Sequence, residues 1–117
     1  MRYQILHPDD GKTIGHFEIN AFPGCASMCV FNHVYLKPEY RGLGLGKAAH
    51  KQRLEMARDL GYDCAICTVK SDNMVETTVL IRAKWKFARH FYNHETANMV
   101  SIYTRDLHDP WEEFGTV

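Results

Sequence analysis

Residues 34–51 place the strongest constraint on how this chain can fold. The segment begins as an alternating apolar run, breaks at Pro38 and continues into an amphipathic helical pattern. Between the two patterns lie three glycines at alternate positions, Gly42, Gly44 and Gly46. Their backbone N–H groups lack side-chain cover, and a helix N-terminus adds the positive end of its dipole. With Arg41 and Lys47 beside it, this turn is suited to hold a phosphate or pyrophosphate.

Length and charge exclude several other classes of protein. The chain has 117 residues, which predicts a single domain spanning 1–117 with a sizeable core. Lys plus Arg and Asp plus Glu both number 14, so no overall field favours nucleic acid or an anionic membrane. No apolar run approaches the roughly 20 residues that a membrane span needs. We therefore expect a cytoplasmic protein without a nucleic-acid or membrane partner.

The cysteines form two closely spaced pairs, Cys25 with Cys29 and Cys64 with Cys67. Such spacing can indicate zinc, and a zinc-stabilised interaction module is one alternative. However, residues 62–69 have the pattern of a strand, and residues three apart on a strand point to opposite faces. We expect four reduced thiols and no metal site.

Apolar alternation and turn residues predict six strands, at residues 3–7, 13–20, 25–36, 62–69, 87–92 and 97–105. Helical spacing predicts helices at 45–60 and from 74 to about 86, with Asn73 capping the second. The expected core stripe of the first helix is Leu45, Ala48, Ala49, Met56 and Leu60. Strand, helix and strand in succession give a right-handed crossover and a parallel pair. Trp111 and Phe114 are expected to pin an irregular tail to the body.

Three kinds of site compete for the glycine turn. A P-loop needs Ser or Thr after Gly-Lys, but Ala48 follows Lys47. A dinucleotide site needs G-x-G-x-x-G, whereas the spacing here is G-x-G-x-G. The third is a coenzyme A pyrophosphate turn of the form Arg/Gln-x-x-Gly-x-Gly/Ala, which residues 41–46 fit at each defined position.

The stretch Val-Tyr-Leu-Lys-Pro-Glu-Tyr-Arg-Gly-Leu-Gly-Leu-Gly-Lys at residues 34–47 resembles motif A of the GNAT family of acyl-CoA-dependent N-acetyltransferases. Segments 10–15, 57–61 and 71–73 resemble the hairpin before that motif, the end of its helix and the start of the next helix. The resemblance implies a GNAT-like α+β fold, a mixed and mainly antiparallel sheet with a central parallel strand pair splayed at the cofactor site and two main helices beside it. Because the chain starts almost directly at the hairpin, it resembles a short form without the family's usual N-terminal strand and helices. An open acceptor side is then expected.

The resemblance also implies site residues. The pyrophosphate of acetyl-CoA would rest on the turn, at Gly42, Leu43, Gly44, Leu45, Gly46 and Lys47. Arg41 would be the leading basic residue, and the main chain of a bulge at Tyr35 and Leu36 would pair with the pantetheine arm. Asn73 matches the motif B asparagine, which commonly contacts the cofactor or orders its loop.

The catalytic residues match the family less well. Many members carry a Tyr that protonates the departing thiolate, and Leu80 stands at that position. The family's usual Gly-Phe pair is Lys84-Trp85 here. His33, on the strand before the turn, is a candidate base, since imidazole is the common proton acceptor near neutral pH. It can equally be a packed or surface histidine. Tyr92 is a weaker candidate for the missing acid.

Two hypotheses follow from these residues. The first is an N-acetyltransferase that moves an acetyl group from acetyl-CoA to an amine by direct attack in a ternary complex. Its acceptor would be a small molecule or a protein lysine or N-terminus. The alternative is a catalytically impaired GNAT-fold protein that binds acyl-CoA or another protein. An exposed edge strand in the last hairpin would favour a homodimer.

Overall fold

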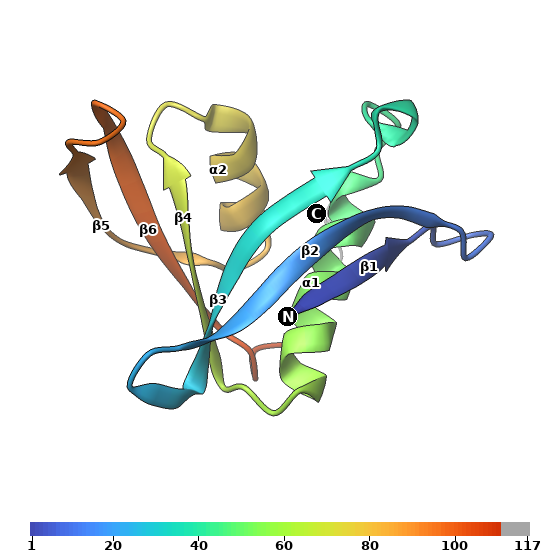
Figure 1. Ribbon diagram of the computed structural model, residues 1–117, viewed down its shortest axis with the longest axis horizontal. Helices are drawn as coiled ribbons and strands as arrows, with labels where there is room; N and C mark the ends of the chain where they lie inside the picture. Colours follow the sequence, from blue (N-terminus) through green and yellow to red (C-terminus); the bar gives the residue numbers. More distant parts are fainter. Residues whose placement is uncertain (111–117) are drawn as a thin grey trace.

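The computed structural model describes residues 1–110 as one six-stranded sheet with two helices (Figure 1). The strands are β1 (Arg2–Leu6), β2 (Thr13–Phe22), β3 (Cys25–Leu36), β4 (Cys64–Lys70), β5 (Lys86–Asn93) and β6 (Asn98–Asp106). The helices are α1 (Gly46–Asp59) and α2 (Met74–Arg82), and a 3-10 turn occupies Pro38–Tyr40. The α+β fold predicted from the sequence is confirmed. The predicted packing of Trp111 and Phe114 lies outside the described residues.

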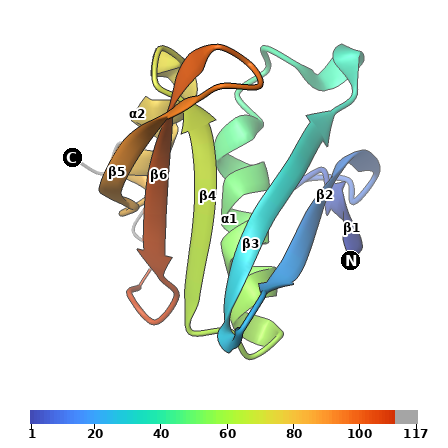
Figure 2. The same cartoon turned by 60° about the vertical axis from the view of Figure 1, so that its left-hand side comes forward.

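The strand order is β1-β2-β3-β4-β6-β5, with β3 and β4 as the parallel pair and antiparallel pairing elsewhere. Pairing between β3 and β4 covers three positions and stops at Val30 and Ile66. Both strands continue beyond that point, β3 to Leu36 and β4 to Lys70, and Figure 2 shows them diverging. The splay predicted for the central pair is confirmed. It opens at the end of the sheet where the glycine turn begins.

Both helices lie on the same face of the sheet, as Figures 1 and 2 show from two directions. This arrangement is expected because two right-handed crossovers that advance in the same direction put their helices on one face. The core lies between this face and the helices, with Ile5, Ile14, Phe17 and Leu80 among its fully buried side chains. Within residues 1–110, no helix covers the opposite face.

The buried face of α1 differs from the predicted stripe. Ala49 is buried as expected, but Leu60 is 46% exposed because α1 ends at Asp59 and Leu60 caps it. The other buried residues of α1 are His50, Arg53, Leu54 and Ala57. Their spacing of three and four residues marks a single helical face. Two polar side chains, His50 and Arg53, therefore lie on the buried face although the predicted stripe did not include them.

Helix α2 also ends earlier than predicted, at Arg82. Lys84 adopts a left-handed backbone conformation with φ of 69°, which ends the helix and redirects the chain into β5. Glycine adopts this conformation without strain, which fits the glycine that the resemblance implies at this position. Within the described residues, no helix is long and apolar enough to cross a membrane.

Candidate functional site

The glycine turn connects the end of β3 to the start of α1, and its glycines meet different demands. Gly42 and Gly44 have φ of 74° and 75°, so the turn itself requires glycine at both positions. Gly46 has no positive φ, and a Cβ added there would meet no atom within 4 Å. Neither backbone strain nor packing therefore demands glycine at 46. Its missing side chain leaves open space at the N-terminus of α1.

Several backbone N–H groups of this turn have no acceptor among residues 1–110. Within residues 1–110, no backbone hydrogen bond is made by the N–H groups of Leu43, Gly44, Leu45 and Gly46. Leu45, the N-cap residue of α1, provides no side-chain cap either. The first N–H groups of a helix otherwise need a capping side chain, water or a ligand. The turn thus presents open donors together with the positive end of a 14-residue helix.

Arg41 secures the turn against the end of β3. Its Nε donates a hydrogen bond to the carbonyl of Leu36 at 2.8 Å, and its guanidinium lies 5.2 Å from the centroid of the Tyr35 ring. A positive charge is therefore held beside the open amides, where it would add to the attraction of an anion.

The bulge in β3 lies two residues earlier than the sequence predicted. Tyr35 and Leu36 pair regularly with His16 and Gly15 of β2, whereas the register shifts between Tyr35 and Asn32. The extra residue lies at 33–34, and His33 has a φ of 48°. The prediction of a bulge at Tyr35 and Leu36 was wrong because the position of a bulge depends on pairing with the neighbouring strand. The bulge releases the main chain at 33–34 from the β2 ladder.

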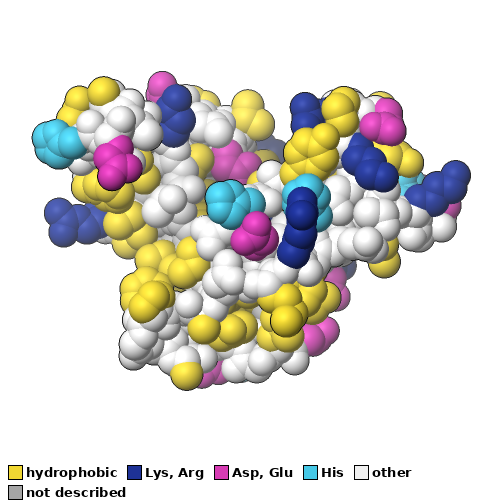
Figure 3. All heavy atoms as spheres, in the orientation of Figure 1, with side chains coloured by type: hydrophobic (Ala, Val, Ile, Leu, Met, Phe, Trp, Pro, Cys, Tyr) yellow, Lys and Arg dark blue, Asp and Glu magenta, His cyan; other side chains and the backbone are white. Residues whose placement is uncertain are grey.

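Two cavities open side by side along these elements. The outer cavity has a volume of about 260 Å³ and is lined by Val34, Leu36, Arg41, Gly46, Ala49, His50, Arg53, Glu76 and Val79. The inner cavity, of about 230 Å³, is lined by Phe31, His33, Val34, His50, Arg53, Cys67, Thr68, Val69, Asn73, Glu76, Leu80 and Trp85. Because they share Val34, His50, Arg53 and Glu76, we treat them as one groove. The groove runs from the glycine turn into the splay between β3 and β4, and Figure 3 shows a notch in the surface between these two parts of the molecule.

The groove brings together some of the predicted site residues and leaves others outside. His33 and Asn73 both line the inner cavity, and the Asn73 side chain also accepts the N–H of Glu76 at 3.2 Å, as predicted for an N-cap. Leu80 lines the same cavity and is 1% exposed. Tyr92 is 49% exposed on β5, packs against His94, and is not among the residues that line the groove. Strand β6 separates β5 from β4 in the sheet.

Three polar residues of the groove were not predicted as site residues: His50, Arg53 and Glu76. His50 is 3% exposed, and its Nε2 accepts the indole N–H of Trp85 at 2.8 Å. Burial lowers the pKa of His50 to about 3, with the charges of Arg53 and Arg105 acting in the same direction. Arg53 is 6% exposed and Glu76 lies half-buried in the first turn of α2. The sequence did contain one signal for Arg53. It lies four residues after Ala49, a predicted core residue, and therefore on the same face of the helix.

The cysteines do not contribute reactive thiolates to the groove. Cys67 lines the inner cavity, but burial raises its pKa to about 12, and burial raises the pKa of Cys29 to about 11. All four cysteines are unpaired thiols. Among residues 1–110 there is no group of three or more His, Cys, Asp or Glu side chains that could hold a metal ion.

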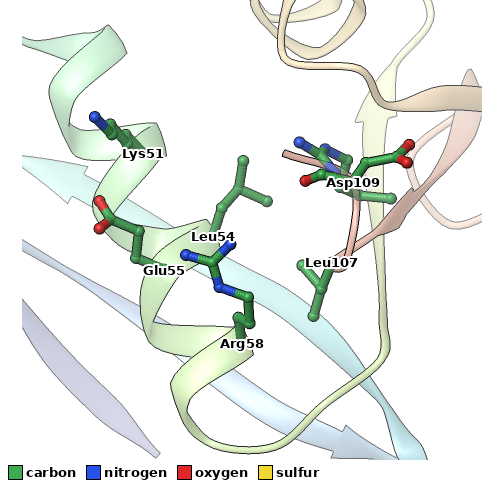
Figure 4. A pocket seen from close by; sticks show the side chains of 7 residues that line it. Lys51, Leu54, Glu55, Arg58, Leu107 and Asp109 are labelled. Atoms are coloured by element: carbon green, nitrogen blue, oxygen red, sulfur yellow. The ribbon is translucent and has the colours of Figure 1, made fainter. Parts of the chain in front are cut away.

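Two further hollows lie away from the glycine turn. Figure 4 shows one between α1 and the segment after β6, where Leu54, Arg58, Leu107 and Asp109 surround a volume of about 20 Å³. This is room for a water molecule and too little for a cofactor. The other hollow, about 370 Å³, lies on β1, β2 and the end of β3, next to Tyr3, Gly15 and Lys37.

Residues 2–77 match the acetyltransferase (GNAT) family. The chain belongs to this family. It is also similar to an uncharacterized N-acetyltransferase of Schizosaccharomyces pombe, with 24% identity over 98 residues. That match covers 82% of this chain and 58% of the relative, so the chain spans little more than half the length of the curated relative it matches.

Solved structures with the same fold include a Bacillus subtilis acetyltransferase in complex with CoA. It superposes with a TM-score of 0.74 at 12% identity, over 90% of this chain and 75% of that one. The ribosomal-protein-S18-alanine N-acetyltransferase of Escherichia coli gives a TM-score of 0.70 at 13% identity, over 100% of this chain and 73% of that one. At these identities the likeness shows the fold.

Proposed function

We propose that residues 1–117 act as one acyltransferase domain that moves an acyl group, acetyl in the simplest case, from coenzyme A to an amine. The observation that carries this proposal is the position of the open turn amides at one end of a groove that leads into the splay. The family match and the CoA complex of a protein with the same fold support the same cofactor.

The residues present fit coenzyme A. The N–H groups of Leu43 to Gly46 and the guanidinium of Arg41 would hold the pyrophosphate, and the space at Gly46 leaves room for it. The main chain released at 33–34 would pair with the pantetheine arm along the groove. Asn73 would contact the cofactor or order the loop before α2, and when bound the cofactor would supply an activated thioester carbonyl.

The reaction replaces a C–S bond with a C–N bond and moves one proton from nitrogen to sulfur. A main-chain N–H group at the bulge would stabilise negative charge on the carbonyl oxygen. His33, on the rim of the inner cavity, is our proposed base for the amine. With Leu80 at the position of the usual acid, no tyrosine lines the groove within the described residues, and the sulfur would take its proton from water.

We propose a protein or peptide amine as the acceptor. The sheet face opposite the helices is open over residues 1–110, which would admit a chain as well as a small molecule. A protein with the same fold acts on the alanine of a ribosomal protein. The four free thiols suit a reducing compartment such as the cytoplasm. The exposed edge strand β5, with Phe87, Phe91 and Tyr92 partly open to solvent, would be the contact of a homodimer.

Leu80 motivates a second candidate function. Its buried apolar side chain replaces a proton donor that contributes about 10²–10⁴ in rate where it acts. A protein of this kind could bind acyl-CoA and contact a macromolecule without turnover.

One experiment distinguishes the two candidate functions. The purified chain is titrated with acetyl-CoA by calorimetry. It is then incubated with acetyl-CoA and longer acyl-CoA thioesters in turn, together with a panel of peptides with free N-termini or lysines, while thiol release is followed. Saturable binding near the micromolar range with peptide-dependent thiol release supports the enzyme. Binding without thiol release over the whole panel supports the second candidate, and absence of binding contradicts both.

A further inference from the structure

The groove contains a buried positive charge that the proposed function does not use. Arg53 projects from α1 into both cavities and is 6% exposed. Its guanidinium lies 4.9 Å from the centroid of the Phe31 ring, while within residues 1–110 its Nε has no hydrogen-bond partner. A buried charged donor without a hydrogen bond is costly, so a ligand that brings an acceptor to this position would be stabilised by it.

Among residues 1–110, neighbouring side chains do not supply such an acceptor. His50 is neutral at physiological pH because burial lowers its pKa to about 3, and its Nε2 is already occupied by the Trp85 N–H. Glu76 is the acidic residue among those that line the groove, and its charge favours the charged form of Arg53. Nevertheless, within residues 1–110 the two form no ion pair, which requires a nitrogen–oxygen distance of 4 Å or less.

Arg53 lies where the outer and inner cavities meet. The outer cavity includes Arg41 and Gly46 of the glycine turn, and the inner cavity reaches Cys67 and Leu80 in the splay. Arg53 is common to both. A CoA thioester whose pyrophosphate rests on the turn amides would extend along the groove toward the inner cavity. Its acyl chain would therefore come close to the Arg53 guanidinium.

We propose that the acyl donor of this protein carries a carboxylate at the far end of its acyl chain, held by Arg53. The donor class is a dicarboxylic acyl-CoA thioester such as succinyl-CoA. A planar guanidinium matches a carboxylate through two parallel N–H···O bonds, and this pairing is strongest away from water. The inference rests on the proposed function, since it assumes that coenzyme A occupies the groove.

We would titrate the protein by calorimetry with three ligands, CoA, butyryl-CoA and succinyl-CoA. CoA binding tests the proposed function, and the comparison of the two thioesters tests the inference. Butyryl and succinyl chains have four carbons each and differ in the terminal carboxylate. For the wild-type chain we expect succinyl-CoA to bind at least 10-fold more tightly than butyryl-CoA, as a charge-assisted hydrogen-bonded pair predicts. Arg53→Met, which keeps a long apolar side chain without the charge, should bring that ratio close to one. Glu76→Gln is the matched control and should keep or increase it.

Equal or weaker binding of succinyl-CoA by the wild type overturns the inference while CoA binding leaves the proposed function intact. A ratio that survives in Arg53→Met overturns it as well, and a ratio lost in Glu76→Gln would show that Glu76 is required for the selectivity, against the proposal. If none of the three ligands binds, the proposed function fails and the inference with it. The wild-type ratio decides the matter even if Arg53→Met does not fold.

Discussion

The glycine turn and the inner end of the groove use different parts of the chain to meet a ligand. The turn offers backbone N–H groups from four consecutive residues, and the Arg41 side chain secures it to the end of β3. The inner cavity is lined mainly by side chains from β3, α1, β4 and α2, and polar and apolar residues line it in equal number. Backbone donors suit a group that all members of a family share, because they depend little on residue identity. Side chains from four elements can be exchanged one at a time, so this end can be adapted to a particular acyl group or acceptor.

The largest expected effect concerns the base at the inner end. We expect His33→Asn to lower kcat/KM by about 10²-fold or more, because a general base contributes at least that much where it acts. Asparagine tolerates the positive φ that His33 adopts, so thermal unfolding should change little. Steady-state kinetics is the measurement, and the loss should fall on kcat/KM while the affinity for CoA stays unchanged. A kcat/KM equal to that of the wild type would remove His33 from the mechanism.

A negative charge introduced at the glycine turn should weaken CoA binding without lowering the stability of the fold. Gly46→Glu places a carboxylate in the open space at the N-terminus of α1, where it repels a pyrophosphate but interacts favourably with the helix dipole. We expect a loss of CoA affinity of about 100-fold with an unchanged or slightly higher Tm. Gly46→Ala is the control and should lose less than about 10-fold. CoA affinity equal to that of the wild type in Gly46→Glu would mean that the pyrophosphate lies elsewhere.

Acid should destabilise the inner end through His50. The folded-state pKa of His50 lies near 3, below its value in the unfolded chain, so the unfolded chain binds more protons at intermediate pH. Its contribution to stability is complete above about pH 6.5 and is lost as the pH falls toward 3. Between pH 6.5 and 4.5 the free energy of unfolding should fall by roughly 2–3 kcal/mol. In His50→Gln, which can still accept the Trp85 N–H, this part of the decline should be absent from chemical denaturation curves measured at each pH.

The smallest effect concerns the residue that ends α2. Lys84 has a φ of 69°, which glycine adopts without the strain of a Cβ. Lys84→Gly should be more stable than Lys84→Ala by about 1 kcal/mol, since both lack the lysine side chain and differ mainly in this strain. Urea denaturation of the two variants makes the comparison. If the alanine variant is as stable as the glycine variant, the backbone at position 84 carries no such strain.

The same contrast explains what the sequence could predict. The turn is a local feature: glycine spacing, Pro38 and a helical pattern within 18 residues were sufficient to place it. The strand ends were predicted within a few residues for the same reason, and so was Asn73 as the cap of α2. The splay was implied by the family resemblance.

The inner end depended on pairings that no local pattern contains. The bulge moved to 33–34 because its position is set by the register with β2. His50 and Arg53 were missed because the predicted stripe of α1 contained only apolar residues, and burial of an arginine follows only from the groove around it. Tyr92 was predicted as a candidate acid without knowledge that β6 lies between β4 and β5.

Backbone amide NMR during a titration with CoA tests the central claim most directly. In ¹⁵N-labelled protein, we expect the N–H resonances of Leu43, Gly44, Leu45 and Gly46 to show the largest saturable downfield shifts, because their donors gain phosphate acceptors. Residues of the 370 Å³ hollow, Tyr3, Gly15 and Lys37, should move little. The largest shifts at that hollow, with the turn amides unmoved, would contradict the account.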